Sequence, residues 1–200
     1  MLVLVRHASP HLPTLGGPDD FHRGLTARGH AEATALAERL AELAPVRVLS
    51  SPYLRAAQTV RPLADVLGLA VETDDDLREW DSGVGPRPDF ARLFAESWAD
   101  PEHARPGAES LTDVSARAVA ALAELSGTGA GTGAGTVVVG SHGTFAARAL
   151  VGLGLAGIDF EFWRRMPMPA VYRVRLEADG VVASGPGLSG LDPAGGASGW

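Results

Sequence analysis

The stretch LVLVRHASP, residues 2–10, decides the fold of this 200-residue chain. Residues Leu2 to Val5 are all Leu or Val, an apolar run that favours a buried strand. Arg6 and His7 then follow with no transition. A structural protein has little use for a strand that ends on a guanidinium beside an imidazole. Because both groups can act on phosphate oxygens, the stretch indicates an enzyme that handles phosphate.

The composition is that of one globular domain. Hydrophobic residues make up 46% of the chain and charged residues 20%, which suits one substantial core better than two. We expect a single domain over residues 1–183 and a flexible tail, rich in Gly, Ser and Pro, over 184–200. A net charge of −7 argues against nucleic acid and anionic lipid as partners, so an anionic ligand needs a local basic cluster.

Two residue types are absent from the sequence. Without cysteine there are no disulfides, thiolate nucleophiles or thiolate zinc sites. All 17 basic residues are Arg, which excludes a catalytic lysine and the lysine of a phosphate-binding P-loop. No segment approaches the roughly 18 to 20 apolar residues of a membrane span, and the first apolar run is too short for a signal peptide. We therefore expect a soluble, cytoplasmic protein.

Hydrophobic periodicity predicts alternating strands and helices. The expected strands are apolar runs bounded by turn residues, over 2–5, 46–49, 136–139, 170–176 and 181–183, with a short extended piece over 71–79. The expected helices carry apolar residues at helical spacing, from Thr26 as N-cap to Pro45, from Ser51 to Leu67, and around 89–98, 111–125 and 144–153. This alternation predicts an α/β fold, a three-layer α/β/α sandwich around a mostly parallel sheet.

Several residues mark where the second helix and a later linker lie. Ser51 is the expected N-cap of that helix, with Pro52 at its first position. Pro62 should kink or divide the helix, and Gly68 should end it. The run GTGAGTGAGT, residues 127–136, precedes a strand, never meets the G-x-G-x-x-G spacing and has no lysine. We therefore interpret it as a flexible linker and not as a phosphate loop.

Three separated segments bring basic and imidazole side chains to one edge of the predicted sheet. Arg6 and His7 follow the first strand, Arg55 lies in the first turn after the second, and His142 follows the strand at 136–139. In such sheets, ligands bind beyond the carboxyl ends of the strands. The planar forks of two Arg residues match phosphate oxygens, and a neutral imidazole is able to attack phosphorus. These residues therefore predict a phosphoryl-transfer site.

At this point six motifs, taken in order, resemble those of the histidine phosphatase superfamily, the group that contains the cofactor-dependent phosphoglycerate mutases. The motifs are LVRHASP (4–10), GLTARGHAEA (24–33), SSPYLRAAQT (50–59), LREWDSG (77–83), GAESLTDVSARA (107–118) and VVVGSHGT (137–144). Each motif alone is weak evidence, but all six in the right order make the assignment strong. The short chain is most similar to the small bacterial phosphatases of this group.

The resemblance implies a role for each matching residue. His7 would be the transiently phosphorylated nucleophile, and Glu79 the acid that protonates the leaving alkoxide and then deprotonates water. The expected catalytic residues are His7, Glu79, His142, Arg6 and Arg55. The expected substrate-binding residues are Arg6, Ser9, Arg55, His142, Gly143 and Thr144. Neither a metal nor another cofactor is expected.

The sequence also departs from the family pattern. Ala8 replaces the usual glycine after Arg-His, so its methyl group is expected to crowd the phosphate. Ser9 replaces a common acidic residue, and Pro13 stands where an Asn often contacts phosphate. Beyond the acid, GVGPRPD at 83–89 replaces the family's Gly-x-Trp-Glu-Gly signature. These departures leave the substrate undetermined.

The expected function is metal-independent hydrolysis of a phosphomonoester of a small metabolite through a phosphohistidine on His7. One alternative is phosphoryl transfer of the phosphoglycerate mutase type, although fewer than 65 residues separate Glu79 from His142 and leave little chain to shield the site. Another is a non-catalytic, phosphate-binding member of the fold. The expected partner is a small phosphorylated substrate, with neither nucleic acid nor membrane, and a homodimer is a possible assembly.

Overall fold

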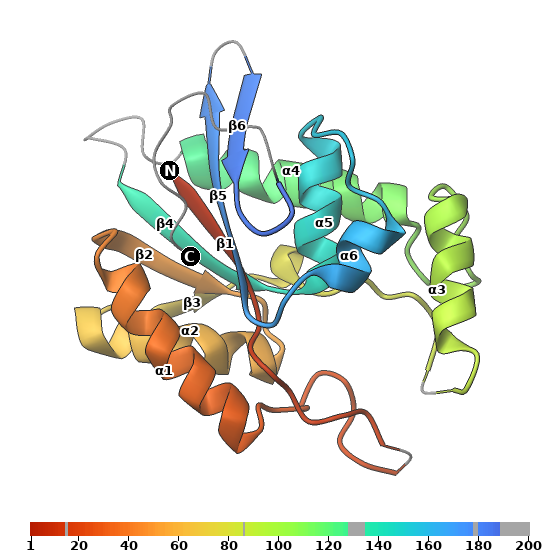
Figure 1. The fold of residues 1–200 in the computed structure, drawn as a ribbon, viewed down its shortest axis with the longest axis horizontal. Helices are drawn as coiled ribbons and strands as arrows, with labels where there is room; N and C mark the ends of the chain where they lie inside the picture. The colour runs from red at the N-terminus through yellow and green to blue at the C-terminus, as the bar shows by residue number, and fades with distance from the viewer. Residues whose placement is uncertain (15, 86, 128–134, 178–179, 189–200) are drawn as a thin grey trace.

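The computed structural model describes residues 1–14, 16–85, 87–127, 135–177 and 180–188. Within these residues, six strands form one sheet: β1 (Leu2–Arg6), β2 (Pro45–Ser50), β3 (Val71–Thr73), β4 (Thr136–Ser141), β5 (Ala170–Glu177) and β6 (Gly180–Ser184). Their order in space is β3-β2-β4-β1-β5-β6, which places β1 and β4 in the centre (Figure 1). The central position of β1 fits its unbroken apolar run, since a central strand is covered on both faces.

Most of the sheet is parallel. β3, β2, β4 and β1 pair in parallel, and only β5 and β6 add antiparallel pairs at one edge. The register pairs Arg6 with Ser141, so β1 and β4 end side by side. The predicted mostly parallel α/β fold is therefore confirmed.

Helices cover both faces of the sheet, which gives three layers (Figure 1). On one face lie α1 (Ala27–Ala41) and α2 (Leu54–Leu67), and on the other lie α4 (Leu111–Gly127) and α5 (Gly143–Gly152). Alternate residues of β1 serve the two cores. Val3 and Val5 pack with α1 and α2, whereas Leu2 and Leu4 pack with α4 and α5. Burial of these side chains stabilises the sandwich and fixes the register of β1, because each side chain must face its own core.

Two further helices flank the carboxyl edge of the sheet. They are α3 (Phe90–Ala99) and the six-residue α6 (Phe160–Arg165), and Trp80, Phe94 and Trp163 form part of an aromatic cluster between them. The sequence predicted α3 but not α6. A helix of fewer than two turns is too short to display apolar periodicity, and Asp159 starts it by accepting from the backbone N–H of Phe162.

The predicted start of α1 is correct, but the helix ends at Ala41, before Pro45, which is the first residue of β2; α2 differs from prediction in two respects. Thr26 is the N-cap of α1, as expected, and accepts from the N–H of Gly29. However, α2 begins with Tyr53 as N-cap and not with Ser51, whose hydroxyl is engaged elsewhere. Pro62 does not divide α2, which runs as one helix until Gly68 ends it in the left-handed conformation at φ 66°.

The extended piece predicted over 71–79 is shorter than expected. Only β3 is a strand, and it is followed by the 3-10 turn η1 (Asp75–Leu77). Residues 128–134 of the predicted linker and residues 189–200 of the predicted tail lie outside the described residues. Before that tail, Tyr172 donates from its hydroxyl to the carbonyl of Pro186 at 3.2 Å, and Leu188 packs against the core. No helix in the described parts of the chain is long and apolar enough to cross a bilayer.

Candidate active site

The two histidines meet where β1 and β4 end. The backbone N–H of His7 donates to the carbonyl of Ser141 at 3.0 Å, which continues the pairing of the strands by one residue. The rings of His7 and His142 then lie edge to face, with their centroids 5.4 Å apart. The structure therefore confirms that β1 and β4 bring these two histidines together, as the sequence predicted.

One hydrogen bond determines which nitrogen of His7 is able to react. Its Nδ1 lies 2.9 Å from the carbonyl oxygen of Ala8, and a carbonyl only accepts, so Nδ1 carries the proton. A neutral imidazole then keeps a lone pair on Nε2. Burial and the charges of Arg55 and Arg6 lower the pKa of His7 to about 3, which keeps the ring neutral. The surroundings of His7 therefore keep its ring neutral and leave the lone pair on Nε2.

His142 is fully buried and is held from two sides. Its Nε2 lies 2.8 Å from the hydroxyl of Ser51, and the ring of Tyr53 packs against it with centroids 5.0 Å apart. Burial, Arg55 and His7 lower the pKa of His142 well below its ordinary value. Its buried Nδ1 has no hydrogen-bond partner within the described residues, so this nitrogen is available to a ligand oxygen.

Arg6 is fixed from behind by backbone. One of its terminal nitrogens donates to the carbonyl of Met166 and, at 3.5 Å, to that of Pro167. Its buried Nε has no partner in the described part of the chain. Gly143 permits this placement, because a Cβ at that position would lie 3.0 Å from Nε of Arg6. Gly143 therefore has a steric role, since its missing side chain makes room for the guanidinium, whereas its contact with substrate stays a prediction.

Arg55 is 2% exposed, and a loop residue occupies its fork. Its Nη1 donates to the carbonyl of Asp20 at 2.6 Å, and its Nη2 donates to the carboxylate of Asp20 at 2.9 Å. Arg23 binds the other oxygen of the same carboxylate, from Nη2 at 2.5 Å and from Nε at 3.1 Å. Asp20 and Arg23 were absent from the predicted site, because nothing in a loop sequence indicates that its side chains reach a strand edge.

Glu79 lies at the amino end of α5. Its Oε1 accepts from the N–H groups of Trp80 at 2.9 Å and Phe145 at 3.3 Å, and its Oε2 lies 3.5 Å from the N–H of Thr144. The side chain is partly accessible, yet it is enclosed enough that burial raises the pKa of Glu79. The N–H groups and the nearby Arg55 and Arg6 oppose that rise. A carboxyl group with a raised pKa is suited to donate a proton near neutral pH.

The side chains of Ala8 and Ser9 have partners on α1 and in the loop before it. Ala8 is fully buried in a cluster with Leu25 and Ala33, so its methyl group fills apolar space. That packing gives the methyl group apolar neighbours, and the expectation that it crowds the phosphate stays a prediction. The N–H of Ser9 donates to Glu32 at 2.9 Å and its hydroxyl also binds that carboxylate, so the structure places Ser9 against α1.

Thr59 was not predicted either, yet it holds the loop that follows His7. Its hydroxyl accepts from the N–H of Ala8 at 3.0 Å and donates to the carbonyl of Arg55 at 2.7 Å. One buried side chain therefore ties the segment of the nucleophile to the helix that carries Arg55. The Gln-Thr pair in the motif SSPYLRAAQT could have indicated this role, because Thr59 lies one turn beyond Arg55 on α2.

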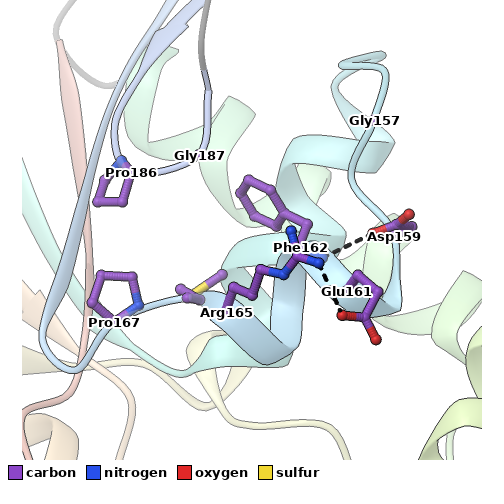
Figure 2. Close-up of a pocket in the computed structure, with 9 residues that line it drawn as sticks. Gly157, Asp159, Glu161, Phe162, Arg165, Pro167, Pro186 and Gly187 are labelled. Atoms are coloured by element: carbon purple, nitrogen blue, oxygen red, sulfur yellow. Dashed lines mark hydrogen bonds and ion pairs between the residues drawn. The ribbon is translucent and has the colours of Figure 1, made fainter.

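A separate cavity of about 440 Å³ lies beside α6 (Figure 2). Phe162, Arg165, Pro167 and Pro186 help to line it, and Figure 2 shows Arg165 beside Glu161. It contains none of the five predicted catalytic side chains and touches the site only through the backbone that binds Arg6. Within the described residues, no three His, Asp or Glu side chains are grouped to hold a metal.

Comparison with known proteins identifies relatives along most of the chain. The family model described as the histidine phosphatase superfamily (branch 1) matches residues 2–184. A Mycobacterium tuberculosis protein of uncharacterised function is 46% identical over 79 residues, which are 38% of each chain. A probable phosphoglycerate mutase GpmB from Enterobacter is 35% identical over 108 residues, half of each chain.

A third relative carries a more specific name. The glucosyl-3-phosphoglycerate phosphatase of Mycobacterium tuberculosis is 33% identical over 141 residues, 62% of this chain and 59% of that protein. The solved structure of the mycobacterial enzyme superposes with a TM-score of 0.69 at 27% identity, over 86% of this chain and 88% of the other. The matches thus span between 38% and 59% of the length of these curated relatives.

The lowered pKa of His7 predicts how stability changes with pH. On acidification from pH 7 to pH 5, unfolded chains protonate this imidazole near pH 6.5, while the folded protein resists until about pH 3. Stability is therefore present at high pH and lost as pH falls, by about 2 kcal/mol from this one group. In urea unfolding at the two pH values, His7→Asn should lose about 2 kcal/mol less than wild type.

The matched control is His30→Asn, which removes an exposed imidazole from α1 and should keep the wild-type loss. An equal loss in wild type and His7→Asn would show that His7 is not held neutral by its surroundings.

Proposed function

The chain belongs to the histidine phosphatase superfamily, branch 1, and from that premise we propose that it hydrolyses a phosphomonoester of a small metabolite through a phosphohistidine on His7. The observation that carries this proposal is the hydrogen bond from Nδ1 of His7 to the carbonyl of Ala8. It leaves a lone pair on Nε2 beside two guanidinium groups. That arrangement suits in-line attack on a bound phosphoryl group.

In the first proposed step, Nε2 of His7 attacks phosphorus and the ester P–O bond breaks. The leaving oxygen takes its proton from the carboxyl group of Glu79, so an alcohol departs and the phosphoryl group remains on nitrogen. The raised pKa of Glu79 favours the protonated form that this step needs. The positive charge that develops on the ring is stabilised by the carbonyl of Ala8 at Nδ1.

In the second proposed step, the Glu79 carboxylate takes a proton from water while that water attacks phosphorus. The N–P bond breaks, its electron pair returns to Nε2, and inorganic phosphate leaves. Glu79 is protonated again and His7 is neutral again, so both groups are ready for another cycle. No metal ion enters either step, since Arg6, Arg55 and the N–H groups at the start of α5 supply the positive charge.

A mutase is the second candidate, because a relative named as a probable phosphoglycerate mutase matches half of the chain. Its first step would be the same. In the second, a hydroxyl group of the bound product would take the phosphoryl group in place of water. Release of inorganic phosphate in proportion to alcohol therefore separates the two functions. The name of the glucosyl-3-phosphoglycerate phosphatase makes esters of phosphoglyceric acid a sensible first group of substrates to test.

The proposed hydrolysis is tested first with p-nitrophenyl phosphate in EDTA near pH 6. Wild type should release nitrophenol and an equal amount of phosphate, whereas His7→Ala should lose at least about 100-fold in rate, because it lacks the nucleophile. His30→Ala is the control and should keep the wild-type rate. Equal rates in wild type and His7→Ala would exclude the mechanism. Binding of phosphate without turnover of any ester would instead indicate a non-catalytic member of the family.

The role of Glu79 is tested with two esters whose leaving groups differ in acidity. Glu79→Gln should lose about 10²- to 10⁴-fold with an alkyl ester such as β-glycerophosphate, and much less with p-nitrophenyl phosphate, whose leaving group departs without a proton. With the alkyl ester, wild-type kcat/KM should fall as pH rises through the raised pKa of Glu79, and this limb should disappear in the variant.

Asp76→Asn, an exposed carboxylate in the turn just before Glu79, is the control and should behave like wild type. An equal loss on both esters would contradict proton donation by Glu79 and assign it a structural role.

A further inference from the structure

The fork of Arg55 is already occupied by Asp20 of the same chain. Both terminal nitrogens of Arg55 donate to Asp20, one to its carbonyl and one to its side chain. Arg23 donates twice to the second oxygen of the same carboxylate. Two Arg residues thus hold one carboxylate in the way that they would hold two oxygens of a phosphoryl group. The Nε of Arg55 is the one nitrogen of its guanidinium without a partner among the described residues.

We propose that the carboxylate of Asp20 is an internal competitor of the substrate, which occupies Arg23 and Arg55 where the phosphoryl oxygens bind. This inference rests on the proposed function, because it assumes that the phosphoryl group binds at Arg55. Substrate binding displaces the carboxylate, and the carboxylate returns when phosphate leaves.

The exposure of the partners shows which of them moves. Arg55 is 2% exposed and lies under the ring of Tyr53, with its guanidinium carbon 4.9 Å from the ring centroid. Asp20 is 52% exposed and belongs to the loop between β1 and α1. Rotating its side chain toward solvent breaks only contacts with the two Arg residues. A competing anion therefore replaces the carboxylate while Arg55 stays in place.

Competition of this kind affects how tightly anions bind. A carboxylate with one negative charge screens the two guanidiniums, so an anion must bring more charge or more oxygens to replace it. A phosphoryl dianion brings three oxygens, which can take over Nη2 of Arg23 and Nη2 of Arg55 from the carboxylate and also reach the unpartnered Nε of Arg55. Without the competitor, every anion should bind more tightly, and the product phosphate should leave more slowly.

The test is calorimetric titration of the intact chain with inorganic phosphate at fixed pH and ionic strength. Asp20→Asn keeps the size of the side chain and removes its charge, so phosphate should bind about ten-fold more tightly than to wild type. Asp20→Ala removes the remaining acceptor and should bind at least as tightly as Asp20→Asn. The matched control is Asp19→Asn, whose carboxylate pairs with the exposed His22 and with neither Arg, and it should bind like wild type.

The outcomes separate this inference from the proposed function. Unchanged or weaker phosphate binding by both Asp20 variants, with binding by wild type intact, would overturn the inference and leave the phosphoryl site standing. Binding by the Asp20 variants alone would support competition in its strongest form. Absence of binding by all the proteins would contradict the phosphoryl site and the inference together.

Discussion

The parallel pairing of β1 with β4 is the constraint on which the site depends. Its register ends both strands at the same level, and the bond from His7 N–H to Ser141 carries the pairing one residue further. Two imidazoles that are 135 positions apart in the sequence (142 − 7) are thereby brought within van der Waals reach of one another. The alternation of Val and Leu along β1 between two cores makes a shift of register expensive, because one step would exchange every buried side chain. The chemistry is therefore anchored in the packing of the sheet.

The second feature of the site is that two imidazoles stay neutral beside arginine side chains. Burial lowers the pKa of His7, and Arg55 and Arg6 act in the same direction, so Nε2 keeps its lone pair at the cost of stability in acid. A cluster with so much positive charge and so little water requires a counter-charge. Asp20 supplies it from the solvent side, while Glu79 lies at the amino end of α5. By the further inference, a phosphoryl dianion takes the place of the Asp20 carboxylate, so that a negative charge faces Arg55 before and after binding.

Features encoded locally were predicted well from sequence, and features made by distant contacts were not. The apolar runs identified β1 and β4, and their ends located His7 and His142. Ser51 shows the limit: its motif is that of an N-cap, but its hydroxyl binds His142, which is 91 positions away. The packing of Ala8 against Leu25 and Ala33 could not be predicted either, because it depends on where α1 lies in the fold. Asp20 lies in a loop without periodicity, so only the folded structure reveals its contact with Arg55.

The most direct measurement is to trap and locate the phosphoryl group. Wild type is mixed with a phosphomonoester, quenched in alkali within milliseconds to preserve a phosphoramidate bond, and examined by peptide mass spectrometry. We expect a phosphoryl group on the peptide that contains His7 in wild type, and none in His7→Ala. A phosphoryl group on any other residue, or steady release of phosphate with no phosphorylated protein at any time, would contradict the central claim.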